Sequence, residues 1–181
     1  MNMHSFATRS TVALIACAAF ASPVLAAEKP ATPLRAIVTW TDPSQFDEVR
    51  DSHGRGMIKN EVWLGDLKKH LERRATRVLP EGQQLEVTFT DIKLAGQFEP
   101  WRGPQFDDVR IVKDIYPPRI DLRFTLKSAD GSVLDEGERT LRDLGFLTRS
   151  IANTSDTLRY EKRMLDEWLN RDFVRAKPAG T

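Results

Sequence analysis

Two acidic side chains are candidates for acid–base chemistry, and the first of them is Glu161. On a helical wheel it falls near the middle of the apolar face of a helix predicted at the C-terminal end. A carboxylate in that position needs a partner, because unpaired burial is costly and raises the pKa. Either it is held in an ion pair or caps backbone amides, or it is an active-site acid. The cations available on neighbouring predicted strands are Arg110, Arg119 and Arg123.

The second acid, Glu99, lies in a short segment with the groups of a binding loop. Phe98 and Trp101 offer aromatic surfaces, Glu99 an acceptor and Arg102 a cationic donor. Loops with such groups often carry function, and a carboxylate beside an aromatic ring is typical of glycan chemistry. The alternative is that the two aromatic side chains only pack the loop onto a sheet.

A basic ridge is predicted on the first long helix. Lys69, Arg73 and Arg77 are four residues apart and lie opposite the apolar stripe, with Asp66 as the nearest acid. Like charges at this spacing disfavour a helix by roughly a few tenths of a kcal/mol per pair. The ridge is therefore either a solvated face or a contact for anionic lipid, lipopolysaccharide or an acidic protein patch.

The remaining polar residues match neither a catalytic triad nor a set of metal ligands. Asp51, Ser52 and His53 are adjacent, whereas triads are assembled in space from separated positions, so a solvated loop is expected. His70 has no second histidine three or four residues away, which favours a surface imidazole. We predict no metal and no cofactor.

The elements that must position these residues follow from hydrophobic periodicity. Apolar side chains at helical spacing predict two helices, and period-two alternation predicts strands, with Asp130-Gly131 as a hairpin turn. The segment 94–104 is expected to be irregular and is followed by a short apolar run at 109–112. The expected order is strand 35–40, helix 57–78, strand 85–90, strand 120–126, strand 133–141 and helix 156–173. This order predicts an α+β two-layer sandwich, with about four strands and both helices packed on one face of the sheet.

The N-terminal residues are typical of a secretory signal. Arg9 precedes an uncharged apolar run, and Val24 and Ala26 fit a cleavage site before Ala27. A lipoprotein anchored through Cys17 is the alternative. Cleavage predicts residues 1–26 as signal peptide, 27–33 as a flexible lead-in, 34–175 as a single domain and 176–181 as a disordered tail. A periplasmic location follows, with no transmembrane span in the mature chain.

The net charge of the chain argues against one class of function. The formal net charge is +1, and loss of Arg9 lowers it to zero, which argues against a dedicated nucleic-acid binder. The mature chain then contains no cysteine, so a single domain of about 155 residues must be stabilised by its core without disulfides.

Several spaced motifs together carry a family resemblance. These are Trp40-Thr-Asp-Pro43, Leu94-Ala-Gly96, Tyr116-Pro-Pro118 and Tyr160-Glu-Lys162 with Trp168. The chain resembles a family exported by Gram-negative bacteria and known as domain of unknown function 3016. The resemblance implies export and a shared fold, and it supplies no catalytic residues.

Three function hypotheses remain. The first is a non-catalytic periplasmic binding or accessory protein that meets an envelope protein, glycan or anionic lipid through the Phe98–Arg102 loop or the basic ridge. The second is a hydrolase of an envelope polymer with Glu161 or Glu99 as acid or base. The third is a subunit whose exposed Trp63 and Trp168 pack against a partner.

Overall fold

The computed structural model describes residues 35–52, 60–149 and 155–174, all within one compact unit. The expected signal peptide, the lead-in and the tail from residue 176 lie outside the described residues. Among the described residues, no helix is both long and apolar enough to cross a bilayer.

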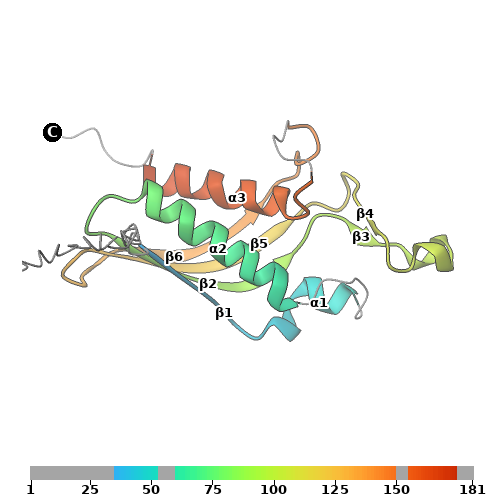
Figure 1. Cartoon of the computed structure of the whole chain (residues 1–181), viewed down its shortest axis with the longest axis horizontal. Coiled ribbons are helices and arrows are strands. Elements are labelled where there is room, and N and C mark those ends of the chain that lie inside the picture. The colour runs from blue at the N-terminus through green and yellow to red at the C-terminus, as the bar shows by residue number, and fades with distance from the viewer. Residues whose placement is uncertain (1–34, 53–59, 150–154, 175–181) are drawn as a thin grey trace, which may run out of the picture. The chain divides into compact units, whose positions relative to one another are not determined.

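A four-stranded mixed sheet forms one layer (Figure 1). Its strands, in spatial order, are β1 (Ala36–Trp40), β2 (Gln84–Lys93), β5 (Arg119–Lys127) and β6 (Val133–Arg142). β1 runs parallel to β2, and the other neighbours are antiparallel. Because parallel strands cannot be joined by a tight hairpin, the chain between β1 and β2 needs a crossover, which contains the first long helix.

Two helices, α2 (Asn60–Val78) and α3 (Arg159–Leu169), cover one face of this sheet (Figure 1). Alternate residues of β2 and β5 point toward them and are buried, as the period-two pattern predicts. The predicted α+β sandwich is therefore confirmed. The largest fully buried side chains of this core are Trp168, Phe46, Phe89, Leu64, Leu67, Leu71, Leu85, Ile92, Ile120, Leu122 and Leu165.

β2 contains an irregularity and continues past its predicted end at residue 90. The register against β5 shifts between Phe89 and Asp91, and both Phe89 and Ile92 are fully buried. An extra residue in one strand of an antiparallel pair changes which side chains face the core. The simple alternation predicted only 85–90, because it breaks at this bulge.

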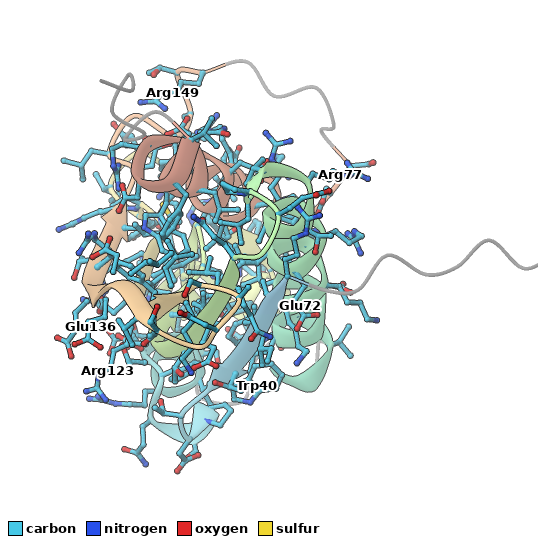
Figure 2. The ribbon with its side chains drawn as sticks, turned by 90° about the vertical axis from the view of Figure 1, so that its left-hand side faces the viewer. Trp40, Glu72, Arg77, Arg123, Glu136 and Arg149 are labelled. Carbon is cyan, nitrogen blue, oxygen red and sulfur yellow. The ribbon has the colours of Figure 1, made fainter. Side chains whose placement is uncertain are left out.

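The outer edge of β1 is covered by side chains of α2. The backbone N–H of Val38 donates to Oε1 of Glu72, and its carbonyl accepts from Nζ of Lys68, at 3.3 and 2.8 Å. Figure 2 shows Glu72 beside the strand, whereas Arg77 points outward from the helix. Unpaired strand edges invite pairing with other chains, so these two side chains occupy groups that would otherwise be available.

Some elements differ from the sequence prediction. α1 (Asp47–Ser52) is an extra short helix in a stretch expected to be a polar loop. α3 begins at Arg159 rather than Asp156, whose side chain instead accepts from the amide of Leu158, and it continues as one π-helical turn, η4 (Asn170–Val174). Residues 57–59 of the predicted first helix lie outside the described residues.

Candidate functional site

Residues 94–118, between β2 and β5, form a segment that we call the arm (Figure 1). It contains a second, two-stranded sheet of β3 (Gln97–Phe98) and β4 (Arg110–Ile111). Two 3₁₀ turns, η2 (Pro100–Arg102) and η3 (Pro104–Phe106), lie between these strands. The segment predicted to be irregular is therefore partly ordered by pairing with the later apolar run.

Two buried glutamates hold the arm where it leaves β2, at residues 94–96, which we call the arm root. The N–H of Leu94 donates to Oε2 of Glu48 at 3.0 Å, and the N–H of Ala95 donates to Oε1 of Glu161 at 2.6 Å. Glu48 comes from α1 and Glu161 from α3, and they are 7% and 1% exposed. Amide capping, one of the interpretations of Glu161 from the sequence, is thus what the structure contains.

Arg110 joins the arm to this cluster. One of its terminal nitrogens pairs with Oε1 of Glu48, and the other donates to the carbonyl of Gly96 at 3.1 Å. Its guanidinium also lies over the ring of Phe98, 4.7 Å from the centroid. Gly96 has a positive φ of 88°, and a Cβ there would lie 2.8 Å from the carbonyl oxygen of Ile111. Glycine is therefore required for this close approach of two backbones.

Burial dominates the acidity of both glutamates. Loss of solvent raises the pKa of Glu161 to about 7, although the hydrogen bond from Ala95 and the charge of Arg110 act in the opposite direction. Burial also raises the pKa of Glu48, with Arg110 again opposing. The second oxygen of Glu161, Oε2, is buried and has no hydrogen-bond partner among the described residues. This carboxyl group therefore favours its neutral form more than an ordinary glutamate does.

Glu99, the other candidate acid, is held by two cations and a phenol of the arm itself, although its buried Oε2 has no hydrogen bond among the described residues besides the ion pair with Arg102. Its Oε1 accepts from Nζ of Lys113 at 2.6 Å and from the hydroxyl of Tyr116 at 2.9 Å, and its Oε2 pairs with Nε of Arg102 at 2.9 Å. The hydrogen bond from Lys113, above all, lowers the pKa of Glu99. Only 1% of the residue is exposed. Glu99 is therefore an ionised structural anchor of the arm.

The two aromatic residues of the predicted binding loop have different environments. Phe98 is buried under Arg110, as the packing alternative proposed, whereas Trp101 is 70% exposed. Arg102 lies beside it, with its guanidinium over the ring of Phe106. The other large apolar side chains exposed on the arm are Val109, Val112 and Ile115. The arm thus exposes apolar side chains at several positions, and Trp101, in η2 at its tip, is the most exposed of them.

The basic ridge is on the surface, as predicted. Lys69, Arg73 and Arg77 are all exposed on α2. His70, expected to be a surface imidazole, is instead half-buried, and its Nε2 lies 2.9 Å from Oδ1 of Asp166 on α3. No group of side chains suited to a metal ion occurs in the described part of the chain.

The adjacent Asp51 and Ser52 serve the local structure. Asp51 pairs with Lys93 of β2, and the hydroxyl of Ser52 donates to the carbonyl of Val49 at 3.0 Å. His53, the third residue of that cluster, lies outside the described residues. The described contacts do not bring these residues to Glu99 or Glu161.

The expectation that Trp63 and Trp168 are exposed is wrong. They are 4% and 0% exposed, because the apolar faces of α2 and α3 turn inward onto the sheet. Trp168 packs edge-on against Phe124 at 5.8 Å, and its indole N–H donates to Asp172 at 3.0 Å. These rings belong to the core, so they offer no surface to a partner.

Sequence reasoning missed Glu48 and the connection through Arg110. Arg110 was among the cations considered for Glu161, but it pairs directly with Glu48 and acts on Glu161 through its charge. Glu48 escaped notice because its short helix has no long apolar period. The Leu94-Ala-Gly96 motif, noted only as part of the resemblance, was the available signal for this site.

The comparison with known proteins agrees with the resemblance. No curated protein matches the chain at a significant level. A family model described as "Protein of unknown function (DUF3016)" matches residues 35–171, which contain the sheet, α2, α3 and the whole arm. Since that match covers most of the chain, the protein belongs to the DUF3016 family.

Proposed function

We propose that this protein is a non-catalytic binding or accessory protein of the periplasm, which engages a protein partner through the tip of the arm. The observation that supports this most directly is the exposure of Trp101, 70% of whose surface is open to solvent. Tryptophan and arginine are enriched at the energetic centres of protein interfaces. Trp101 and Arg102 are adjacent at the tip, so they form a compact anchor for a partner.

The exposed side chains of the arm favour a protein over a glycan or an anionic lipid. Exposed apolar side chains on the arm accompany acidic ones, Asp108 and Asp114, which would repel an anionic membrane surface. Glu99, which would have served as the acceptor for a sugar, is already occupied by Lys113 and Tyr116. Exposed apolar and polar side chains together are the usual composition of a protein interface.

The hydrolase hypothesis receives no support from either carboxylate. An acid or base must come within hydrogen-bond reach of its substrate. Glu99 and Glu161 are each 1% exposed, so neither reaches solvent in the described structure. We therefore retain the binding hypothesis alone.

Photocrosslinking tests the proposal directly. The full-length chain is expressed in its own host with a photoreactive amino acid in place of Trp101, and the periplasmic fraction is irradiated. We expect a discrete crosslinked protein, and we expect its recovery with the unmodified chain to fall at least tenfold when Trp101 is changed to alanine. N-terminal sequencing of the recovered chain, expected to begin at Ala27, tests the export step.

Two matched positions serve as controls. Arg123 is exposed on the sheet, and Arg73 is exposed on the basic ridge. A photoreactive group at either position should give no crosslink to the same partner. Crosslinking at position 73 but not at position 101 would mean that the partner binds the basic ridge instead of the arm. No specific crosslink at any of the three positions would contradict the proposed function.

A further inference from the structure

The arm root contains more carboxylate than cation. Glu48 and Glu161 face it from α1 and α3, and Arg110 of β4 is the cation whose charge acts on both. Lys93, at the end of β2, contributes a weaker attraction to Glu48 but is itself paired with Asp51. When both glutamates are ionised, this buried cluster therefore has an excess of negative charge.

The geometry around Glu161 makes it the group that carries a proton. Glu48 uses both oxygens, one for the amide of Leu94 and one for Arg110. Glu161 uses only Oε1, and its Oε2 is buried without a hydrogen-bond partner among the described residues. An ionised oxygen without donors is costly in a dry environment, whereas a protonated carboxyl group still accepts the Ala95 N–H through Oε1.

We propose that Glu48, Arg110 and Glu161 form a single-proton switch that controls how firmly the arm is attached to the rest of the domain. With a proton on Glu161, the cluster is neutral and both consecutive amides stay bound. Loss of that proton leaves a buried negative charge, which the chain relieves by opening the arm root so that Glu161 reaches water. The switch thus regulates the arm on which the proposed function rests, but it operates without a partner.

The position of the two amides explains why opening would move the arm. Leu94 and Ala95 directly precede Gly96, whose positive φ turns the chain into the arm, and the Gly96 N–H is itself bound to the carbonyl of Tyr116 at 3.0 Å. The root is therefore held from α1, from α3, from Arg110 of β4, which donates to the Gly96 carbonyl, and from the returning end of the arm. Release of the two glutamates removes two of these four attachments.

The sign of the pH dependence follows from linkage. Glu161 in the closed root has a pKa of about 7, and an exposed glutamate has an ordinary value of 4.5. The closed root therefore binds the proton more tightly than the open one, and opening becomes easier as pH rises between these two values. From pH 5.5 to 7.5, the equilibrium constant for opening should rise about 20-fold.

Hydrogen exchange on the full-length chain measures this opening without any partner. Protection factors of the amides at 94–98, corrected for the intrinsic pH dependence of exchange, should fall by about that factor over this pH range. They should also be lower than those of the amides of Leu122 and Phe124 in central strand β5, which report global unfolding. Equal protection in the two regions would mean that opening is global, and the proposal would be wrong.

Three variants separate the switch from a general loss of stability. In Glu161→Gln the transition near pH 7 should be lost, leaving only the pH dependence that Glu48 itself contributes, and in Glu48→Gln the transition should move to lower pH because the repelling charge is gone. Glu48→Gln also provides the test if Glu161→Gln does not fold. The matched control is Glu72→Gln, a buried carboxylate that binds the amide of Val38 outside the arm, and it should leave the transition in place. A transition that persists in Glu161→Gln, or that keeps its pH in Glu48→Gln, overturns the proposal.

Discussion

Glu48 and Glu161 accept hydrogen bonds from two consecutive backbone amides, those of Leu94 and Ala95, although one lies before the first long helix and the other in the last. Consecutive amides that leave a strand have no ladder partner, and buried amides must be satisfied. The two carboxylates meet that requirement. The arm is consequently attached to parts of the chain that are distant in sequence.

The free energy of unfolding of the whole domain should also depend on the protonation of Glu161. Because the pKa of Glu161 is about 7 in the folded chain and 4.5 ordinarily, its contribution is fully present below pH 4.5 and is lost as pH rises through 7. The loss amounts to about 3 kcal/mol. Urea denaturation of the parent and of Glu161→Gln at several pH values measures it. The free energy of unfolding of Glu161→Gln should rise relative to that of the parent from pH 4.5 to 7.5. A difference between the two that does not change with pH would contradict this assignment.

Two glycines with nearly equal positive φ provide a second prediction. Gly96 and Gly131 have φ values of 88° and 86°, but a Cβ on Gly96 would meet the carbonyl of Ile111 at 2.8 Å, whereas one on Gly131 would meet nothing within 4 Å. Gly131→Ala should cost about 1 kcal/mol from conformational strain, and Gly96→Ala about 3 kcal/mol or more because a clash is added. The midpoints of urea denaturation measure the two costs, provided that the dependence of the unfolding free energy on urea concentration is the same in both variants. Equal costs would show that the close approach is unimportant.

The covered edge of β1 should depend on Glu72. Changing it to alanine leaves the N–H of Val38 without its partner, at a cost of about 2 kcal/mol, and opens a strand edge to other chains. Thermal denaturation and light scattering should show lower stability and more aggregation. Lys69→Ala, on the exposed side of the same helix, is the control and should change stability by less than about 0.5 kcal/mol. Identical behaviour of both variants would argue against edge protection.

Solvent access at the arm tip can be tested by fluorescence quenching. All four tryptophans lie in the described part of the chain, and Trp101 is 70% exposed whereas Trp63 and Trp168 are buried. Acrylamide should quench mainly Trp101, so Trp101→Phe should remove most of the quenchable emission. Trp40→Phe, at a half-buried position, should remove much less. Quenching that is unchanged in Trp101→Phe would mean that the tip is covered.

The sequence alone determined the elements with strong periodicity. The alternation in β2 and β5 and the apolar stripe of α2 depend on local spacing, so they predicted the layers, the helical face and the exposed basic ridge. The motifs also identified the family, which the match to residues 35–171 confirms. Glu161 was expected to point inward for the same reason, since its neighbours on the helical face are apolar.

Only the tertiary structure decided how the polar groups are paired. The short α1 and the bulge in β2 have no clear period, and the pairing of β3 with β4 joins short segments separated by the two turns at the arm tip. Trp63 and Trp168 are buried because the sheet covers the helical faces that carry them. The meeting of Glu48, Arg110 and Glu161 depends on three distant segments arriving at one amide pair. Local spacing carries no information about such a meeting, because it is fixed by the packing of the whole core.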